Sequence, residues 1–298
     1  MGMDQLNDHS VFAAVTEAGG FSSAARRLGI TASGASKSVG RLEARLGVRL
    51  FTRTTRKVSL TEEGQQFYAR VRAILDDISE AEAEIQNTRA DLRGRVRIDM
   101  PAMLGQGVVM GHLLDFKRTH PGVDLDIRFN DHISDLVEQG IDLAFRIGEL
   151  PDTSLHARKV MDTTWLTCAA PGYLDRHGPP ERPADLGDHS CASYIFKGSG
   201  RAFQWRFTIN DRPVRFEPPQ HLCVNDGNAY LAVARSGLAI VQDLDFNLTA
   251  DLKGGTLVEV MQTFKSAGPP VSIVYPDGRH LPRRVRAVFD HLVTRMLL

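Results

Sequence analysis

The chain has 298 residues, of which 42% are hydrophobic, and its 36 Lys and Arg balance its 36 Asp and Glu, so the formal net charge is zero. This length is enough for two or three domains with separate cores. The first sixty residues are basic, with nine Lys and Arg against four Asp and Glu, and the rest of the chain carries a net charge of −5. A basic face on a small domain is typical of a nucleic-acid-binding module.

Composition also excludes several classes of protein. No apolar run approaches the ~20 residues needed to span a bilayer, and Asp4 and Asp8 stand where a signal peptide would carry bases. Three widely spaced cysteines, without a CxxC pair, indicate neither a disulfide framework nor a zinc site, and the ten histidines show no metal-ligand spacing. We therefore expect a cytoplasmic protein that uses no membrane, metal or other cofactor.

Three helices are predicted in the first domain, residues 1–60. Apolar residues at spacings of three and four indicate a helix over Asn7–Ala18. Ser22 or Ser23 is placed to cap a second helix that runs through Leu28, and Thr31 to cap a third that runs to about Leu46. The positions expected to face the core are Ala24, Ala25, Leu28, Ile30, Val39, Leu42 and Leu46.

A helix, a tight turn and a second helix form a helix-turn-helix, whose second helix enters the major groove of DNA. Ser33, Ser36 and Lys37 lie in the first turns of that helix and are expected to reach base edges, while Arg41, one turn later, is better placed for phosphate. The stretch "RLFTRTTRKVSLT" predicts two short strands that form a wing against the DNA backbone. Its candidate phosphate ligands are Arg53, Arg56 and Lys57.

Within "FSSAARRLGITASGASKSVGRLEARLGVRLFTRTTRKVSLTEEG", the motifs AA-x-x-L, S-K-S-V, L-E-x-x-L-G, L-F-x-R and L-T-x-x-G stand in a fixed order. In these motifs the chain resembles the LysR-type transcriptional regulators. The resemblance implies binding to double-stranded DNA, and it supports DNA roles for Ser33, Ser36, Lys37, Arg53 and Arg56. Ala32 stands where the family often has a glutamine that contacts DNA.

The sequence of residues 61–92 predicts a long helix that runs to about Ala90. Its apolar residues repeat at heptad spacing and form a seam along one side of the helix, which indicates pairing with another helix. The alternative is a lone helix packed on its own domain. The resemblance favours a homodimer through residues 67–92, with a tetramer as a further assembly. The seam positions, separated alternately by four and three residues, are Phe67, Val71, Ile74, Ile78, Ala81, Ile85, Thr88 and Leu92.

Residues 93–298 alternate between strand-like and helix-like segments, which is typical of an α/β domain with a parallel or mixed sheet. Helices are expected over Val108–Arg118, Ala229–Arg235 and Arg284–Leu297. The expected strands are Val96–Met100, Val123–Phe129, Ile141–Ile147, Thr164–Ala169, Cys191–Phe196, His221–Val224, Leu238–Val241 and Val271–Tyr275.

The segments "HPGVDLDI", "DLVEQGIDLAFRIGEL" and "YPDGRHLPRRVRAVFDHL" extend the resemblance over most of this region. It implies a periplasmic-binding-protein-like effector domain with a small-molecule effector between two lobes. The first lobe is expected over residues 95–162 and 265–298, and the second over 163–264. The fold predicted for the whole chain is α/β, with an N-terminal winged helix-turn-helix, a long linker helix and this two-lobed domain.

Ligands of open α/β sheets bind beyond the carboxyl ends of the strands. Arg146 ends an apolar strand, where its charge needs either an effector or an ion-pair partner such as Asp226 or Asp142. Ala102 stands where the family often has a hydroxyl residue. The full set of candidate effector-binding residues is Pro101, Ala102, Met103, Arg146, Tyr194, Phe196, Asn225 and Asp226.

Three other interpretations remain open. An α/β enzyme is not favoured, because the chain lacks GxSxG, a Walker loop, GxGxxG after a strand and HExxH, and we assign no catalytic residue. Cys168, Cys191 or Cys223 could instead make a thiol-based redox-sensing regulator. A scaffold that dimerises without touching DNA is the third. The sequence favours a DNA-binding transcriptional regulator controlled by a small molecule that is anionic or strongly hydrogen-bonding.

Overall fold

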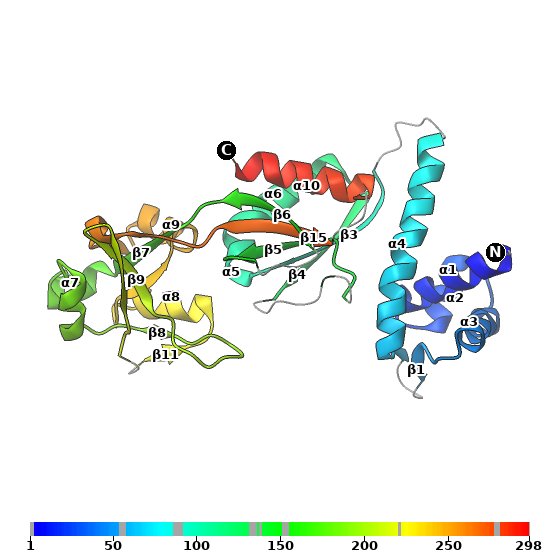
Figure 1. Cartoon of the computed structure of the whole chain (residues 1–298), viewed down its shortest axis with the longest axis horizontal. Coiled ribbons are helices and arrows are strands. Elements are labelled where there is room, and N and C mark those ends of the chain that lie inside the picture. The colour runs from blue at the N-terminus through cyan, green and yellow to red at the C-terminus, as the bar shows by residue number, and fades with distance from the viewer. Residues whose placement is uncertain are drawn as a thin grey trace.

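The computed structural model describes residues 3–53, 58–85, 92–130, 136, 139–150, 155–219, 222–276 and 281–297. Figure 1 shows a helical head at the amino-terminal end, a long helix α4 (Glu62–Ile85) beside it, and two lobes that extend away from this helix. The predicted α/β class, with its N-terminal helix-turn-helix and its large second domain, is confirmed.

The head packs three helices, α1 (Met3–Ala18), α2 (Phe21–Leu28) and α3 (Ala32–Leu46). The predicted cap at Thr31 is confirmed, since its hydroxyl accepts a hydrogen bond of 3.0 Å from the amide of Gly34. Inward positions of all three helices form one core, which includes Val11, Phe12, Val15, Ala24, Ala25, Val39 and Leu42.

The predicted cap at Ser22 or Ser23 is wrong. Helix α2 begins one residue earlier, at Phe21, and its N-cap residue Gly20 makes no side-chain cap. The ring of Phe21 packs edge-on against Phe51, with 5.7 Å between centroids. Packing on the wing therefore draws Phe21 into the helix and moves the two serines past the capping position.

Three of the predicted core positions are also wrong. Leu28 is 39% exposed, Ile30 is 41% exposed and Leu46 is 38% exposed. Leu28 and Leu46 are the last residues of their helices, and Ile30 lies in the turn between them. All three side chains lie outside the hydrophobic core that the helices of the head enclose.

The wing consists of β1 (Phe51–Arg53) paired antiparallel with β2 (Val58–Leu60). The buried carboxylate of Glu43 on α3 accepts hydrogen bonds from the amides of Leu50 and Phe51, at 2.8 and 3.2 Å. Helix α4 approaches so closely that a Cβ on Gly64 would lie 2.0 Å from the carbonyl oxygen of Leu50. These contacts give Glu43 of the L-E-x-x-L-G motif and Gly64 of the L-T-x-x-G motif structural roles beside the wing.

Helix α4 uses part of its apolar seam inside its own chain. Phe67 packs against Phe12 with 5.6 Å between centroids, and Val71 is buried in the core of the head. Leu92 follows the helix and packs against the core of the first lobe, so the eight-position seam predicted for pairing is too long. Ile74 is 53% exposed, whereas the side chains of Ala81, Ile85 and Thr88 lie outside the described residues.

The same helix also contacts the first lobe. Buried Arg72 donates to the carbonyl oxygens of Arg95 and Gly140, at 3.0 and 3.2 Å. Arg97 of the lobe donates to the hydroxyl of Tyr68 at 3.2 Å, and its guanidinium lies 5.5 Å from the centre of that ring. The linker helix is therefore joined to the head by apolar packing and to the lobe by buried polar contacts.

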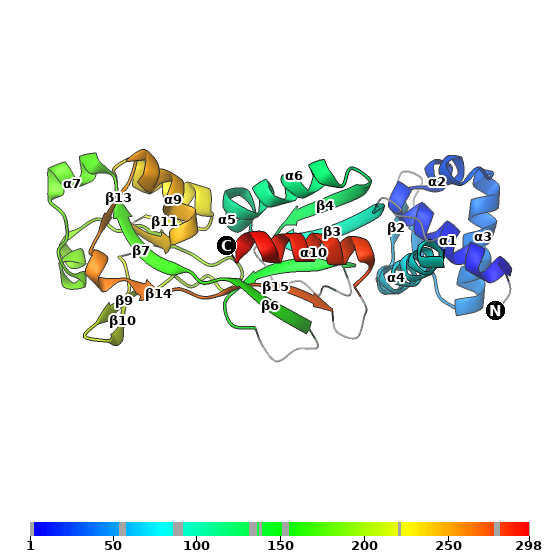
Figure 2. The ribbon, with the colours of Figure 1, turned by 90° about the horizontal axis from the view of Figure 1, so that it is seen from above.

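The first lobe is a five-stranded mixed sheet. Strand β3 runs parallel to both of its neighbours, and β15 runs antiparallel to β5 and β6. Helices α6 (Met110–Thr119) and α10 (Arg283–Met296) pack side by side on one face and enclose the core (Figure 2). The strand order is β4 (Val123–Phe129), β3 (Gly94–Met100), β5 (Leu143–Ile147), β15 (Val271–Pro276) and β6 (Leu155–Met161).

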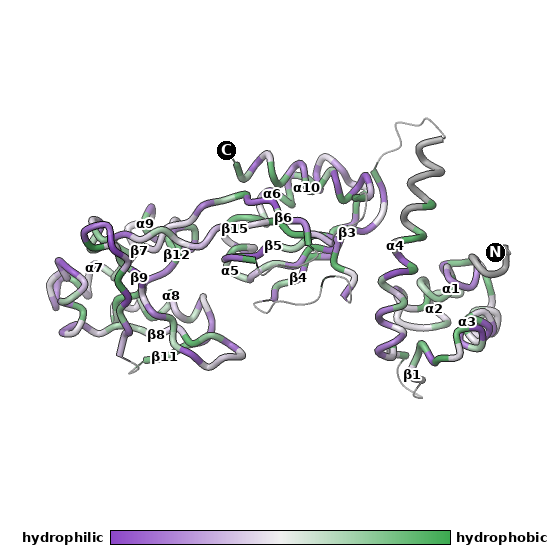
Figure 3. Tube along the Cα trace, viewed as in Figure 1, coloured by the Kyte–Doolittle hydropathy of each residue, from purple (hydrophilic) through white to green (hydrophobic). Residues whose placement is uncertain are grey.

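The second lobe is built around β7 (Thr164–Ala169), which pairs antiparallel with its sheet neighbours. A hairpin, two short parallel strands and three helices complete it, and Figure 3 shows apolar and polar stretches alternating along its elements. These elements are β12 (Val241–Leu244), β13 (Val258–Val260), β14 (Ser266–Ala267), β9 (Trp205–Ile209), β10 (Arg212–Phe216), β8 (Ser193–Tyr194), β11 (Cys223–Val224), α7 (Pro171–His177), α8 (Gly227–Arg235) and α9 (Asp245–Gly254).

Strand predictions succeed best in the buried sheets. Those over Val123–Phe129 and Thr164–Ala169 are confirmed without change, but Leu238–Val241 is wrong, because the strand lies at Val241–Leu244. The strand expected over Cys191–Phe196 shrinks to two residues. The helix expected from Val108 begins as a short α5 (Ala102–Leu104) and a π-helix over Gly105–Val109, in which a Cβ on Gly105 would collide with Phe129 and Met100.

Two chain crossings join the lobes. The first lies between β6 and β7 and the second between β14 and β15, so β14 still belongs to the second lobe, three residues past the boundary expected at 264. The crossings bond to each other, since the hydroxyl of Thr163 donates to the carbonyl of Pro269 at 2.7 Å and its own carbonyl accepts from Gly268 at 2.8 Å. This double crossing is the place where the lobes can hinge.

Candidate functional site

The candidate DNA-binding surface is the amino-terminal half of α3. Ser33 and Lys37 are exposed on it, and Ser36 is half-buried. The small side chains of Ala35 and Ser38 are buried behind this surface. The arrangement presents short polar groups and one cation outward, as a helix that lies in a groove requires.

Arg41 is held in a more structural arrangement than the sequence suggested. Its Nη2 donates to the buried carboxylate of Asp8 on α1 at 2.5 Å, and Ser38 donates to the same oxygen. Burial acts to raise the pKa of Asp8, but the hydrogen bonds from Arg41 and Ser38 lower it below its usual value. The side chain of Arg41 is still 58% exposed, so one face of its guanidinium remains accessible to a phosphate.

The wing candidates lie wholly or partly outside the described residues. Arg53 ends β1, and its side chain lies outside the described residues, as do Arg56 and Lys57 entirely. Their phosphate-binding roles therefore stay predictions.

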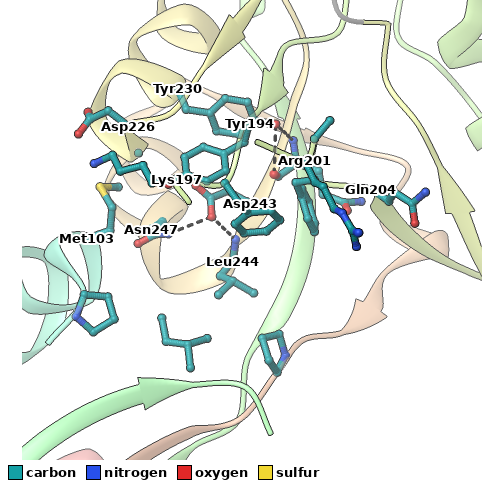
Figure 4. A pocket seen from close by; sticks show the side chains of 18 of the residues that line it. Met103, Tyr194, Lys197, Arg201, Gln204, Asp226, Tyr230, Asp243, Leu244 and Asn247 are labelled. Atoms are coloured by element: carbon teal, nitrogen blue, oxygen red, sulfur yellow. Dashed lines mark hydrogen bonds between the residues drawn. The ribbon is translucent and has the colours of Figure 1, made fainter. Parts of the chain in front are cut away.

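A cavity of about 1020 Å³ lies between the two lobes (Figure 4). Pro101, Ala102, Met103 and Arg146 line it from the first lobe, and Tyr194, Phe196 and Asp226 line it from the second. Asn225 is exposed and does not border it. Seven of the eight candidate effector-binding residues thus meet at one place, although they come from four separate stretches of sequence.

Arg146 is buried, and its ion-pair partner is Asp99 rather than Asp226 or Asp142. Its Nη1 donates to a carboxylate oxygen of Asp99 at 2.9 Å, and Asp99 is fully buried on the neighbouring strand β3. Asp142 instead accepts from the amide of Arg97, and Asp226 caps α8 by accepting from the amide of Ala229. The parallel pairing of β3 and β5 brings Asp99 and Arg146 together, which linear spacing does not reveal.

Three buried polar atoms of cavity-lining residues have no hydrogen-bond partner among the described residues. They are Nη2 of Arg146 and Nε1 of Trp165, which are donors, and Oδ1 of Asn247, which is an acceptor. A buried polar group without a partner is costly, so such groups mark places where a ligand or water completes the bonding.

Asp243 also borders the cavity. Its carboxylate accepts from the amide of Leu244 at 2.7 Å and from the side-chain amide of Asn247 at 2.9 Å, as Figure 4 shows. Burial raises the pKa of this carboxyl to about 6, and these two hydrogen bonds only partly oppose the rise. Within the described part of the chain it forms no ion pair with a cation.

The lobes also touch at the end of the cavity. A Cβ on Gly227 would lie 2.5 Å from Cγ of Met103, and Asn228 donates to Gln106 at 3.4 Å. The predicted apolar wall is formed by Tyr194 and Phe196, whose rings meet edge-on at 5.6 Å.

Sequence reasoning missed the residues that complete the second lobe's side of the cavity. The loop Lys197–Arg201 contributes Lys197, Ser199, Gly200 and Arg201 to the lining. Gly198 and Gly200 have φ angles of 89° and 65°, which the tight turn requires. Trp165, Asp243 and Asn247 belong to no recognisable motif. Asp243 could still have been identified, because it is a charged residue at the end of the apolar run before "DFNL".

Two of the three cysteines are unsuited to redox sensing. Cys168 and Cys191 are buried, and burial raises the pKa of each thiol to about 12. Little reactive thiolate forms at such a pKa. Cys223 is exposed on β11.

The described residues contain no group of three or more metal-ligating side chains. Among the described helices, none combines the length and the apolar character that a membrane span requires.

Two family models match the chain and together cover most of it. The model described as "Bacterial regulatory helix-turn-helix protein, lysR family" matches residues 6–65, and the model "LysR substrate binding domain" matches residues 89–297. The first covers the head and the second covers both lobes.

Similar proteins span the full length of the chain. An uncharacterized HTH-type transcriptional regulator of Haemophilus influenzae is 35% identical over 286 residues, which are 96% of this chain and 99% of the relative. The regulator CrgA of Neisseria meningitidis serogroup C is 32% identical over 96% of this chain and 95% of its own. The solved structure of CrgA from Neisseria meningitidis superposes with a TM-score of 0.63 at 30% identity, covering 99% of both chains.

Proposed function

The chain belongs to the LysR family of transcriptional regulators, and we propose that its α3 reads duplex DNA under the control of an organic acid bound between its lobes. The observation that carries the effector part is Arg146. Its guanidinium is buried and paired with Asp99, yet its Nη2 has no acceptor among the described residues, and Arg146 lines the cavity. A carboxylate that accepts from Nη2 would complete the hydrogen bonding of this group.

We assign base readout to Ser33, Ser36 and Lys37, which share the accessible half of α3. Arg41, Arg53, Arg56 and Lys57 would bind phosphate, and Arg41 would do so with the face of its guanidinium that Asp8 leaves exposed. Such a protein acts in the cytoplasm, where bacterial DNA lies. A DNA operator with two half-sites requires two copies of the chain, each with one head. The exposed Ile74 on α4 supports pairing of the two copies through this helix.

Control by a ligand requires that the two lobes and the head be linked. The contacts of Arg72 and Tyr68 with the first lobe supply such a link, in addition to the chain connection at Arg93 and Gly94. A ligand shifts the arrangement only if it binds one arrangement more tightly than the other. An enzymatic role has less support, because the cavity holds no nucleophile paired with a base among its described residues and the relatives are named as regulators.

A thermal-shift screen of carboxylic acids on the full chain tests the effector site. A ligand at a hundred times its Kd should stabilise the protein by about 2.7 kcal/mol, and Arg146→Gln should lose most of that shift. Arg118→Gln is the matched control, since Arg118 forms an exposed ion pair with Asp115 away from the cavity. If every stabilising acid binds Arg146→Gln as well as wild type, Arg146 is a structural ion pair and the assignment is wrong.

A further inference from the structure

The cavity has two poles of opposite character, one on each lobe. On the first lobe, Arg146 offers a buried donor to a hydrogen-bond acceptor. On the second lobe, the buried Oδ1 of Asn247 has no donor among the described residues, and the two hydrogen bonds that the neighbouring Asp243 carboxylate accepts from them come from uncharged groups. The first lobe can therefore bind a hydrogen-bond acceptor of a ligand, and the second lobe can bind a hydrogen-bond donor.

We infer that the cavity takes an amphoteric organic molecule, whose carboxylate binds Arg146 and whose protonated amine binds Asp243 and Asn247. This inference rests on the proposed effector role of the cavity and names the chemistry of its ligand. An ammonium group carries three donors and a positive charge, so one amine can serve both the Asn247 oxygen and the Asp243 carboxylate.

The energetic reason lies in the surroundings of Asp243. Asp243 is half-buried, and the desolvation of its carboxyl opposes ionisation, which is costly where no described cation pairs with it. The other charged residues on the cavity wall are the cations Lys197, Arg201 and Arg206 and the acids Asp226 and Glu217. Within the described part of the chain, none of the three cations forms an ion pair with Asp243. A ligand cation would supply the missing counter-charge.

The position of the poles gives this ligand a further property. Arg146 belongs to β5 of the first lobe, whereas Asp243 and Asn247 belong to β12 and α9 of the second. A molecule that satisfies both poles must bridge the lobes, so its affinity depends on their separation. An acid without the amine would satisfy only the pole on the first lobe, so its affinity would depend less on the separation of the lobes.

Isothermal titration calorimetry on the full chain at pH 8 tests this chemistry, because Asp243 is ionised there. The probes are amino acids, the ω-amino acids from 3-aminopropanoate to 6-aminohexanoate, and the aminomethylbenzoates, each compared with the same acid lacking its amine. We expect at least one amphoteric probe to bind about tenfold or more tightly than its matched acid.

Asp243→Asn should abolish the advantage of the amine and leave the matched acid's affinity unchanged, since asparagine can still accept from Leu244 and Asn247. Asp245→Asn is the control, because it removes the same charge from a residue outside the cavity lining. Thermal denaturation of each variant confirms that it folds.

The outcomes separate this inference from the proposed function. If matched acids bind as tightly as amphoteric probes, if Asp243→Asn keeps the preference for the amine, or if no probe binds, the amphoteric assignment is overturned. The proposed function fails separately, if acids of both kinds bind Arg146→Gln as well as they bind wild type.

Discussion

At the scale of single residues, charge burial decides which groups are structural and which can act on a partner. Asp8 and Glu43 are buried acids whose bonds lie within the head. Arg146 is also buried, but its Nη2 has no hydrogen-bond partner among the described residues, and the half-buried Asp243 accepts bonds from Leu244 and Asn247 without an ion pair to a described cation. The polar groups of the cavity therefore lower the folding stability of the ligand-free protein, as is typical of binding sites.

Asp243 predicts a pH dependence of stability. The unfolded chain ionises this carboxyl near 3.8 and the folded chain near 6, so the folded state binds more protons between these values and loses stability as the pH rises through them. Asp243→Asn removes this loss. We expect the variant to be more stable than wild type by on the order of 1–3 kcal/mol at pH 8 and by much less at pH 4, in urea unfolding of the ligand-free protein. An equal difference at both pH values would contradict the raised pKa.

Lys37 and Arg53 predict two different losses of DNA binding. Lys37→Ala should cost about 1–3 kcal/mol on the preferred sequence and little on random duplex, because a base contact is lost. Arg53→Ala should weaken binding to all duplexes and lower the salt slope by about one, because a phosphate contact is lost. Anisotropy titrations at several salt concentrations measure both effects. Equal losses on both kinds of DNA for Lys37→Ala would remove its base-reading role.

The residues of the cavity can be predicted from the sequence where a local rule places them, and not where the order of strands in the sheet places them. Pro101, Ala102, Met103 and Arg146 were found because strand ends collect at one edge of a sheet, which is a local rule. The Asp99 partner of Arg146 was missed, since strand order, and not spacing, makes them neighbours. Asp243 was missed because its strand was predicted three residues too early.

At the scale of elements, α4 contacts two other parts of the chain and leaves one position of its apolar seam exposed. Its first turns pack on the head, Arg72 and Tyr68 face the first lobe, and Ile74 is exposed. The heptad pattern predicted this helix, which the structure describes to Ile85, but it assigned all of the apolar positions to pairing; the predicted end near Ala90 lies outside the described residues. A period of three and four identifies an apolar face without revealing what covers each part of that face.

The part of the seam left exposed predicts where α4 pairs. Ile74→Asp with Ile78→Asp should place charges in the interface between two copies, at a cost of several kcal/mol for each unpaired ion, so the dimer should dissociate at low concentration. Light scattering measures the mass. Gln65→Asp with Gln66→Asp is the control, because both glutamines are exposed on other faces of the helix. An unchanged mass for the isoleucine variant would show that another surface holds the assembly.

At the scale of the whole molecule, the head, helix and lobes are linked by few contacts. The core of the head and the core of the first lobe are separate, and α4 bridges them through the polar bonds of Arg72 and Tyr68, while Leu92, which follows the helix, packs on the first lobe. Such sparse links suit a regulator, since small changes in lobe arrangement can reposition the heads.

Arg72 predicts how the head stays docked. Arg72→Ala removes its hydrogen bonds to the carbonyls of Arg95 and Gly140, so α4 and the head should move more freely relative to the first lobe. Small-angle X-ray scattering should show a larger radius of gyration, while Arg70→Ala, a change at an exposed position two residues away, should leave it unchanged. An identical radius for Arg72→Ala would mean that apolar contacts alone hold the docked arrangement.

The most direct test of ligand-controlled DNA reading is one anisotropy titration. Full-length protein is titrated against a fragment enriched from genomic DNA, with and without the acid that gives the largest thermal shift. We expect the acid to change the Kd of wild type for DNA by at least about fivefold and to leave that of Arg146→Gln unchanged. If the acid binds wild type in the cavity and the DNA affinity stays the same, the lobes do not control the head.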